Sequence, residues 1–382
     1  MKRFNFYDGS ARLDSLNSAE RFALSFGACL DDGDSLVLSY SGSDDAALYS
    51  GIILNTLSQL GINVYYLTYG EEFLSSFCAE ALSARCYLHI FSSASVSVRA
   101  GGVNGLGLDD SFFNDITKNY NSPKLKNLKA LNIKTINSAD HIVKLYKDKI
   151  ENHLTKFNGL NVTVNTSSLL VAKLFDEIIR NKNDIYGEEI VFSFSLRCDK
   201  VTAYSSLSGY VYHETLMMLV LDYLLSKGER VKLTNDYSFL RDRLNDNRNY
   251  CDIVEDKCLK DISFENRFIY DSFLLLTLVV KRLCENKESL YEAVNKVKPV
   301  YLTERYVYTG AGAEEKINYM KSKGILDKNG RTANSNSRAT VKTSKEGRGL
   351  LLYADAFSFE AAGALCDEIE GYIDRINLDK EE

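Results

Sequence analysis

Residues 194–200 read Phe-Ser-Leu-Arg-Cys-Asp-Lys and are the most informative stretch of this sequence. They follow an apolar run at residues 187–193, which we predict to be a strand. Residues 201–204 are predicted to form a second strand, and residues 214–225 a helix. The stretch is therefore predicted to be a polar loop between two strands of an α/β unit.

In this setting the loop resembles the magnesium-binding loop of the alpha-D-phosphohexomutases, the family of phosphoglucomutase and phosphomannomutase, whose pattern is Asp-x-Asp-x-Asp-Arg. Of these acids only the last is present, as Asp199, while Ser195 and Arg197 stand at the other two positions and Lys200 replaces the arginine. Magnesium needs oxygen ligands in near-octahedral geometry, and a guanidinium supplies a repelling charge instead. We expect no bound magnesium and no other cofactor, and we expect Arg197 to pair with a nearby acid, Asp199 being the first candidate.

The resemblance covers most of the chain and implies its architecture. The expected fold is α/β, with three similar mixed α/β domains and a smaller α+β C-terminal domain around a central cleft. A polar stretch at residues 119–134 and the Lys-Gly-Glu-Arg run at 227–230 mark the first two boundaries. We place the four domains at residues 1–130, 131–228, 229–300 and 301–382.

Hydrophobic periodicity predicts the elements inside these domains. Residues 46–60 have a helical repeat and lie between two apolar runs at 34–39 and 62–67. A strand–helix–strand unit of this length implies parallel pairing through a right-handed crossover. Elsewhere we predict strands at 160–164, 231–233 and 349–354, and helices at 138–157, 169–180, 272–284 and 359–376.

Composition narrows the class of protein. The chain has 382 residues, of which 45% are hydrophobic and 26% charged, as in ordinary globular proteins of more than one domain. A net charge of −6 argues against nucleic acid or an anionic membrane as partner. The longest apolar runs are far shorter than a membrane span, and the N-terminus lacks an apolar signal core, so we expect a cytoplasmic protein. Eight cysteines and four histidines without metal-ligand spacing predict no independent metal site.

The first-domain loop of the family, Thr-Ala-Ser-His-Asn-Pro, carries the serine whose phosphate is exchanged with the sugar. Counting back from Asn104-Gly105 places Ser97 at that position, which we prefer, whereas matching the preceding strand places Ser95 there. In either alignment a valine replaces the histidine of the family. A serine needs an activating base or metal to exchange phosphate efficiently. The alternative interpretation is a Ser-rich loop without chemistry.

The third-domain loop of the family, Gly-Glu-x-Ser-Gly-His, binds sugar hydroxyl groups. Counting back from the predicted helix start at Asp271-Ser272 aligns Glu255 with the family glutamate, while residues 257–259 replace Ser, Gly and His. The resemblance therefore implies one remaining substrate contact, Glu255. The alternative is a solvated turn.

The fourth-domain loop of the family, Arg-Pro-Ser-Gly-Thr-Glu-Pro-Lys, binds phosphate. The strand and helix that follow align it with residues 342–349. Backbone N–H groups around Gly347 could help to hold an anion there. A solvated basic turn is the alternative. The residues that we assign to phosphate binding are Lys342, Ser344, Lys345 and Arg348.

Because the four loops lack most of the functional residues of the family patterns, the sequence favours a catalytically inactive pseudoenzyme. It would bind a sugar phosphate or another small anion, or act as a scaffold or regulator of a protein partner that the sequence does not identify. Three alternatives stay open. One is an active phosphoglucomutase or phosphomannomutase, an intramolecular phosphotransferase and hence an isomerase of carbohydrate metabolism; another is an enzyme with altered, metal-independent chemistry. The third is an interaction protein whose cleft is closed by side chains.

Overall fold

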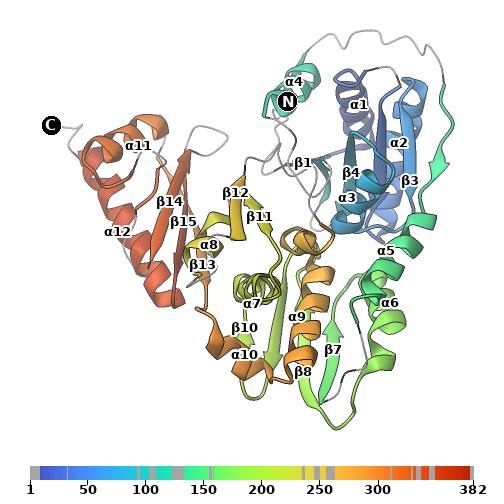
Figure 1. Cartoon of the computed structure of the whole chain (residues 1–382). Coiled ribbons are helices and arrows are strands. Elements are labelled where there is room, and N and C mark those ends of the chain that lie inside the picture. Colours follow the sequence, from blue (N-terminus) through green and yellow to red (C-terminus); the bar gives the residue numbers. More distant parts are fainter. Residues whose placement is uncertain are drawn as a thin grey trace.

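The computed structural model describes most of the chain, and the predicted α/β fold class is confirmed. The description covers residues 9–378 apart from 32, 93–94, 103–107, 109, 123–132, 155–156, 158, 235–236, 245–249, 255–262, 310–311, 328–329, 333–336 and 344–348. Four sheets follow one another along the chain. We call each sheet, with the helices around it, a unit. Figure 1 shows the first unit (blue) and the fourth unit (red) on opposite sides, with the second and third units below them.

The first unit is a six-stranded sheet in the order β1-β5-β4-β2-β3-β6. As predicted, strands β2 and β3 are parallel and are joined by helix α2. Ser43 begins that helix, because its side chain accepts a hydrogen bond from Ala46 N. The strands are β1 Ser10–Arg12, β2 Ser35–Tyr40, β3 Asn63–Leu67, β4 Cys86–Ser92, β5 Val96–Gly101 and β6 Asn137–Ser138; the helices are α1 Leu16–Gly27, α2 Asp44–Gln59, α3 Glu72–Ala81 and α4 Asp110–Asn121.

The second unit has a four-stranded sheet in the order β10-β9-β8-β7. The helix predicted at 138–157 is shorter at both ends, since Ser138 belongs to β6 and pairs with Tyr66 of β3, and the helix ends at Glu151. Apolar Leu154 and Phe157 suggested a longer helix, but they enter the core from the connection that follows it. The strands are β7 Leu160–Asn165, β8 Glu188–Phe194, β9 Val201–Ser205 and β10 Gly209–Val211; the helices are α5 His141–Glu151, α6 Leu169–Ile178 and α7 His213–Ser226.

The third unit pairs two parallel strands, β11 Val231–Thr234 and β12 Cys251–Val254. Its long helix α9, Ser272–Asn286, begins where the sequence predicted. Asp271 caps it, because its carboxylate accepts a hydrogen bond from Leu274 N at 2.9 Å. The described residues of the unit also form two shorter α-helices, α8 Ser238–Asp242 and α10 Leu290–Lys296.

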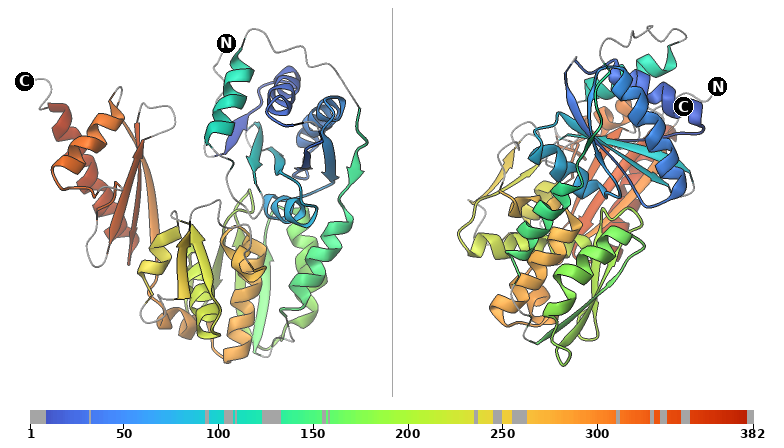
Figure 2. Two further views of the ribbon diagram at one scale, coloured as in Figure 1. Left: turned by 45° about the horizontal axis from the view of Figure 1, so that its top comes forward. Right: turned by 90° about the vertical axis from the view of Figure 1, so that its right-hand side faces the viewer.

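The fourth unit is an antiparallel sheet in the order β13-β15-β14, with two helices on one face (Figure 2). Helix α12 begins after Ser358, which caps it because its side chain accepts a hydrogen bond from Ala361 N at 3.1 Å. The elements are β13 Tyr301–Tyr308, α11 Ala313–Ser322, β14 Arg338–Thr343, β15 Gly349–Ala356 and α12 Phe359–Leu378.

The hydrophobic core is divided unequally among the units. One cluster runs from α3 of the first unit through the helices of the second and third units. A second cluster fills the first unit, and a third lies wholly inside the fourth unit, within residues 313–376. Burial of apolar surface therefore joins the first three units, whereas the fourth has a core of its own.

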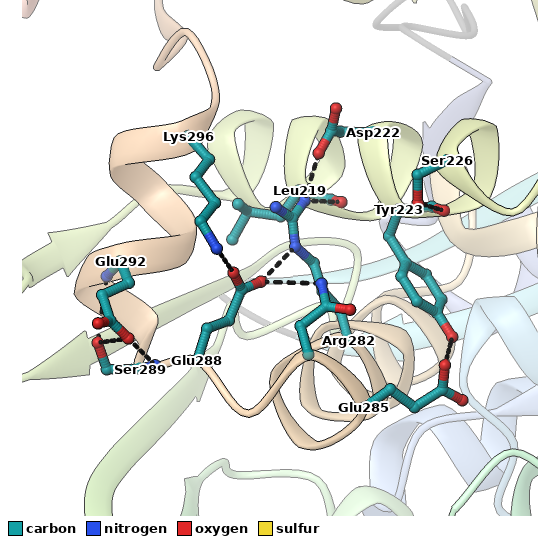
Figure 3. A network of polar contacts seen from close by, with 11 residues as sticks. Leu219, Asp222, Tyr223, Ser226, Arg282, Glu285, Glu288, Ser289, Glu292 and Lys296 are labelled. Carbon is teal, nitrogen blue, oxygen red and sulfur yellow. Dashed lines mark hydrogen bonds and ion pairs between the residues drawn. The ribbon is translucent and has the colours of Figure 1, made fainter.

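A buried ion network fixes helices α7, α9 and α10 to one another (Figure 3). Arg282 Nε donates to the Glu288 carboxylate at 2.9 Å, and both side chains are nearly inaccessible, at 3% and 2% exposure. The same guanidinium donates to the carbonyl of Leu219 at 2.6 Å and pairs with Asp222 at 3.0 Å. Lys296 of α10 reaches the other oxygen of Glu288. The network lies among these helices and satisfies the buried charges there.

Two groups of contacts among the described residues link the fourth unit to the rest. Arg243, which follows α8, pairs with Asp355 of β15 at 3.0 Å, and both side chains are only 7% exposed. Arg338 of β14 pairs with the same Asp355 at 3.2 Å and with Asp242 of α8 at 2.8 Å. We call these four residues the interunit clamp. The second group is a cluster of three aromatic rings, Tyr212, Tyr301 and Phe359.

None of the helices in the described part of the chain combines the length and hydropathy needed to cross a bilayer.

Candidate functional site

The loop between β8 and β9 is a tight turn closed by its own hydrogen bonds. Ser195 N donates to Lys200 O at 2.9 Å, and Lys200 N donates to the Ser195 hydroxyl at 3.2 Å. Cys198 N donates to Ser195 O at 2.9 Å, and Cys198 has the left-handed φ of 53°. A residue other than glycine is strained in that region of φ, and the hydrogen bonds of the turn hold Cys198 in this conformation. The loop predicted from the sequence is present and its shape is fixed from within.

The turn is also anchored from the third unit. The Ser272 hydroxyl, at the start of α9, donates to Cys198 O at 2.5 Å. The Cys198 side chain is buried in the core, and burial raises the pKa of its thiol to about 12. This cysteine is therefore a packing residue rather than a nucleophile.

Both oxygens of the Asp199 carboxylate are engaged inside the turn. The Ser195 hydroxyl donates to Oδ1 at 2.6 Å, and Arg197 Nη2 pairs with Oδ2 at 2.7 Å. Burial alone would raise the pKa of Asp199, but the Ser195 hydrogen bond and the charges of Arg197 and Arg99 outweigh it and hold the pKa below its usual range. The predicted pairing of Arg197 with Asp199 is thus confirmed, and the acid is ionised at neutral pH.

This geometry does not fit a magnesium ion. The ion needs several oxygen ligands at about 2.0–2.1 Å in octahedral array. Of the three aligned positions only Asp199 carries a carboxylate, its oxygens already bind Ser195 and Arg197, and the guanidinium lies where an ion would have to approach. Nor do three or more His, Cys, Asp or Glu side chains gather as metal ligands elsewhere in the described residues.

A second pair of charges reaches this turn from the first unit. Arg99 of β5 pairs with Glu72 of α3 at 2.6 Å, and the Tyr87 hydroxyl donates to the same carboxylate at 2.8 Å. Burial raises the pKa of Glu72, against the opposing effect of Arg99, and the charges of Asp199 and Arg197 also act on it. The ion pairs of the two units are therefore close enough to influence each other.

A neighbouring contact joins the same two units. The Ser168 hydroxyl, which caps helix α6, donates to the Glu71 carboxylate at 2.5 Å. Glu71 is only 6% exposed. Burial raises its pKa to about 7, the Ser168 hydrogen bond lowers it, and the adjacent Glu72 raises it further. A carboxyl group that titrates near neutral pH thus lies at the boundary of the first and second units.

Histidine chemistry beside this site is blocked by burial. His89 of β4 shares a hydrogen bond between Nδ1 and the Ser39 hydroxyl at 2.9 Å, and Ser39 contacts the Ser75 hydroxyl at 2.5 Å. Burial, with the charge of Arg99, lowers the pKa of His89 to about 3. An imidazole of this kind is a weak base at neutral pH and is poorly suited to activate a serine.

The preferred phosphoserine candidate does not lie in a loop. Ser97 is inside strand β5, where it pairs with Phe91 of β4 on one side and Arg12 of β1 on the other. The alternating apolar residues Val96 and Val98 are buried on the opposite face, and this period of two makes the segment a strand. The alternate candidate, Ser95, lies in the bend between β4 and β5. Of the two candidate serines, the structure thus places only Ser95 outside a strand.

The other predicted ligand contacts are only partly visible. Lys342 is exposed at the end of β14, with its amino group 5.6 Å from the centre of the Tyr353 ring. Four assigned residues lie outside the described residues: Glu255, Ser344, Lys345 and Arg348. Their roles stay predictions.

Sequence reasoning missed the contribution of the first unit to this site. Arg99, Glu71 and Glu72 were not among the candidates, although Arg99 lies two residues after Ser97. The signal was available, because alternation in a strand puts residues 97 and 99 on one face. Glu71 is the N-cap and Glu72 the first residue of helix α3. This helix is buried around much of its surface, so its amphipathic period is weak and it was not predicted.

The sequence matches no protein-family model and no curated protein. Its structure does have relatives. A phosphoglucomutase/phosphomannomutase family protein of Burkholderia thailandensis has a TM-score of 0.70 at 12% identity, covering 97% of this chain and 96% of that chain. The phosphoglucomutase parafusin of Paramecium, in an open form, has a TM-score of 0.59 at 8% identity, covering 97% and 94% of the two chains. An N-acetylglucosamine-phosphate mutase of the alpha-D-phosphohexomutase superfamily reaches 0.52 at 10%, covering 96% of each chain.

The chain has the fold of the alpha-D-phosphohexomutases. The architecture implied by the sequence resemblance is thereby confirmed over nearly the whole length. At these identities the likeness concerns the phosphohexomutase fold, and activity is a separate matter because one fold hosts many functions.

Proposed function

We propose that this chain is a catalytically inactive protein of the phosphohexomutase fold, which binds a sugar phosphate or another small anion and acts as a binding or regulatory protein. The observation that carries the proposal is the Arg197–Asp199 ion pair. The one acid that remains in the metal loop is bound to a guanidinium at 2.7 Å, and Ser195 binds its other oxygen. A mutase of this fold would need the same acid as a metal ligand.

The serine chemistry supports the same proposal. Exchange of phosphate at a serine requires an activating base or a metal. Ser97 is held in a β-strand, and His89 in the neighbouring strand is a buried, weakly basic imidazole. Loss of several catalytic parts together leaves little rate, since such parts act as a unit.

Ligand binding is proposed at the fourth unit. Lys342 presents an exposed amino group at the end of β14, and the sequence adds Lys345 and Arg348 shortly after it. Charge-assisted hydrogen bonds to phosphate are worth roughly 1.5–3 kcal/mol each. Such contacts select for the phosphate and discriminate little between sugars, because hydroxyl recognition would rest on Glu255 alone.

Two measurements test the proposal. The purified full chain, with magnesium and a hexose 1,6-bisphosphate primer, is expected to show no interconversion of glucose or mannose 1- and 6-phosphates. Turnover that disappears in Ser97→Ala or Ser95→Ala would contradict the proposal and identify the nucleophile. Turnover that persists in EDTA would instead support an enzyme with metal-independent chemistry.

Calorimetric titration with glucose 1-phosphate and mannose 1-phosphate tests the ligand. We expect similar, salt-sensitive affinities for both, because the contacts are exposed charges. A Lys342→Ala/Arg348→Ala variant is expected to lose this binding. Equal affinity in the variant and the unmodified protein would exclude the fourth unit as the anchor, and absence of any heat would favour an interaction protein with a closed cleft.

A further inference from the structure

Two ion pairs lie beside the boundary between the first and second units, which the Ser168–Glu71 hydrogen bond crosses at 2.5 Å next to Glu72. Glu72 and Arg99 belong to the first unit and are 2.6 Å apart. Asp199 and Arg197 belong to the second unit and are 2.7 Å apart. The side chains of Glu72, Asp199 and Arg99 are 16%, 23% and 24% exposed, and that of Arg197 is 46% exposed, so water screens the two pairs in part.

The two pairs act on each other across the unit boundary. The charge of Arg99 contributes to the ionisation of Asp199, which lies in the other unit. The charges of Asp199 and Arg197 in turn act on Glu72, with opposite signs. The charges of the two pairs sum to zero, and we call these four groups the four-charge cluster.

We infer that Arg197, together with Arg99, is a built-in replacement for a divalent cation, which holds the carboxylates of the first and second units together without metal. Two guanidinium groups carry the same charge as one divalent ion. The inference concerns the organisation of the cleft and stands whether or not the chain binds a sugar phosphate.

The turn that carries Arg197 is built to hold this charge in place. It is closed by the hydrogen bonds between Ser195 and Lys200 and is anchored to α9 through Ser272. The backbone therefore positions Arg197 before any ligand arrives. A guanidinium is planar, donates several hydrogen bonds and stays charged at all physiological pH values. The cluster should thus keep its geometry at any concentration of divalent cation.

Removal of the Arg197 charge tests the inference on the intact protein. We expect Arg197→Gln to melt at a lower temperature than the unmodified chain, because Asp199 and Glu72 then repel each other with one counter-charge fewer. Arg197→Lys, which keeps the positive charge, is expected to recover most of the loss. The matched control is Arg180→Gln, since Arg180 also pairs with an aspartate, Asp176, at 3.2 Å but on an exposed surface. Its effect should be small.

A second test puts carboxylates in place of Ser195 and Arg197 and asks whether the turn then binds a divalent cation. In Ser195→Asp/Arg197→Asp, three carboxylates would stand at alternate positions of the turn. We expect millimolar magnesium or manganese to raise the melting temperature of this variant by a few degrees and EDTA to reverse the effect. The unmodified protein and Arg180→Gln should respond to neither. Calorimetric titration with magnesium chloride should show saturable binding to the double variant alone.

Three outcomes would overturn the inference. One is saturable magnesium binding or cation-dependent melting of the unmodified protein. Another is an Arg197→Gln protein that melts like Arg180→Gln. The third is a folded Ser195→Asp/Arg197→Asp variant whose melting temperature changes with neither magnesium nor manganese. Mutase turnover that is unaffected by EDTA would contradict the proposed function but leave this inference standing, so the two can fail separately.

Discussion

Glu71 shows how one buried carboxyl group can make the stability of this protein depend on pH. Its pKa rises from the ordinary 4.5 of a glutamate to about 7 in the folded chain, mainly through burial. Between these values the folded state binds a proton that the unfolded state has released. Stability therefore falls as pH rises through this window, and the loss is complete above about pH 7. Its magnitude is at most roughly 3 kcal/mol.

The prediction at this residue concerns Glu71→Gln. Glutamine can still accept the hydrogen bond from Ser168 but has no proton to lose. We expect the variant to melt close to the unmodified protein at pH 5 and above it at pH 8. Melting curves across this range measure the effect. Exposed Glu189 supplies the control, since Glu189→Gln should shift the curve equally at both pH values. Parallel curves for Glu71→Gln and the unmodified chain would show that Glu71 keeps an ordinary pKa.

At the same scale, the sequence predicted some parts of the candidate site and missed others for identifiable reasons. The Arg197–Asp199 pair could be predicted because both residues lie in one short loop between confirmed strands. Arg99 and Glu72 reach the same place from another unit, and contacts of that range depend on how the units pack. Ser97 was aligned by counting from Asn104-Gly105, and the count ignored the period of two that makes its segment a strand.

At the scale of elements, helices and strands with a clear hydrophobic period could be predicted from the sequence. Helix α2 between the parallel strands β2 and β3 was predicted within two residues at its ends. Helix α3 was missed, because most of its residues are buried and no polar face marks it. Helix α5 was predicted too long, because apolar residues beyond its end pack in the core from a connection. Hydrophobic periodicity thus predicts amphipathic elements well, but it does not give the presence or the bounds of fully buried ones.

The ion network of α9 yields a prediction at the scale of elements. Arg282→Met would leave Glu288 buried at 2% exposure with one acid–base partner fewer, and it would remove the side-chain hydrogen bond to the carbonyl of Leu219. Such loss of one member of a buried pair typically costs about 3–5 kcal/mol. We expect a large drop in the midpoint of denaturant unfolding followed by circular dichroism.

Two further variants are compared with Arg282→Met: one removes both buried charges, and the other breaks an exposed ion pair. Arg282→Met/Glu288→Leu removes both buried charges, so it should be less destabilised than the single variant. Arg305→Met breaks the more exposed pairs of Arg305 with Asp367 and Glu370 and should change the midpoint little. If Arg282→Met matched Arg305→Met, the network of Figure 3 would contribute nothing measurable to the packing of α7, α9 and α10.

Across the whole molecule, the fourth unit differs from the others in how it is attached. The first three units share a continuous apolar core, whereas the fourth keeps its own. The contacts that join it to its neighbours include the interunit clamp and the cluster of three aromatic rings. An attachment of this kind depends on a few specific groups rather than on a large apolar area, so single substitutions can test it.

Asp355 is the residue on which the clamp depends, because it pairs with both Arg243 and Arg338. Asp355→Asn removes its charge and leaves Arg243 buried at 7% exposure without its acid, which is costly. The apolar core of the fourth unit is untouched, so that unit should stay folded while its orientation loosens. We expect a larger radius of gyration in small-angle X-ray scattering and faster hydrogen exchange at the clamp end of β15. Asp367→Asn is the matched control, since Asp367 pairs with Arg305 inside the same unit. An unchanged radius of gyration in Asp355→Asn would mean that the remaining contacts, among them the Arg338–Asp242 pair and the aromatic cluster, suffice to hold the fourth unit.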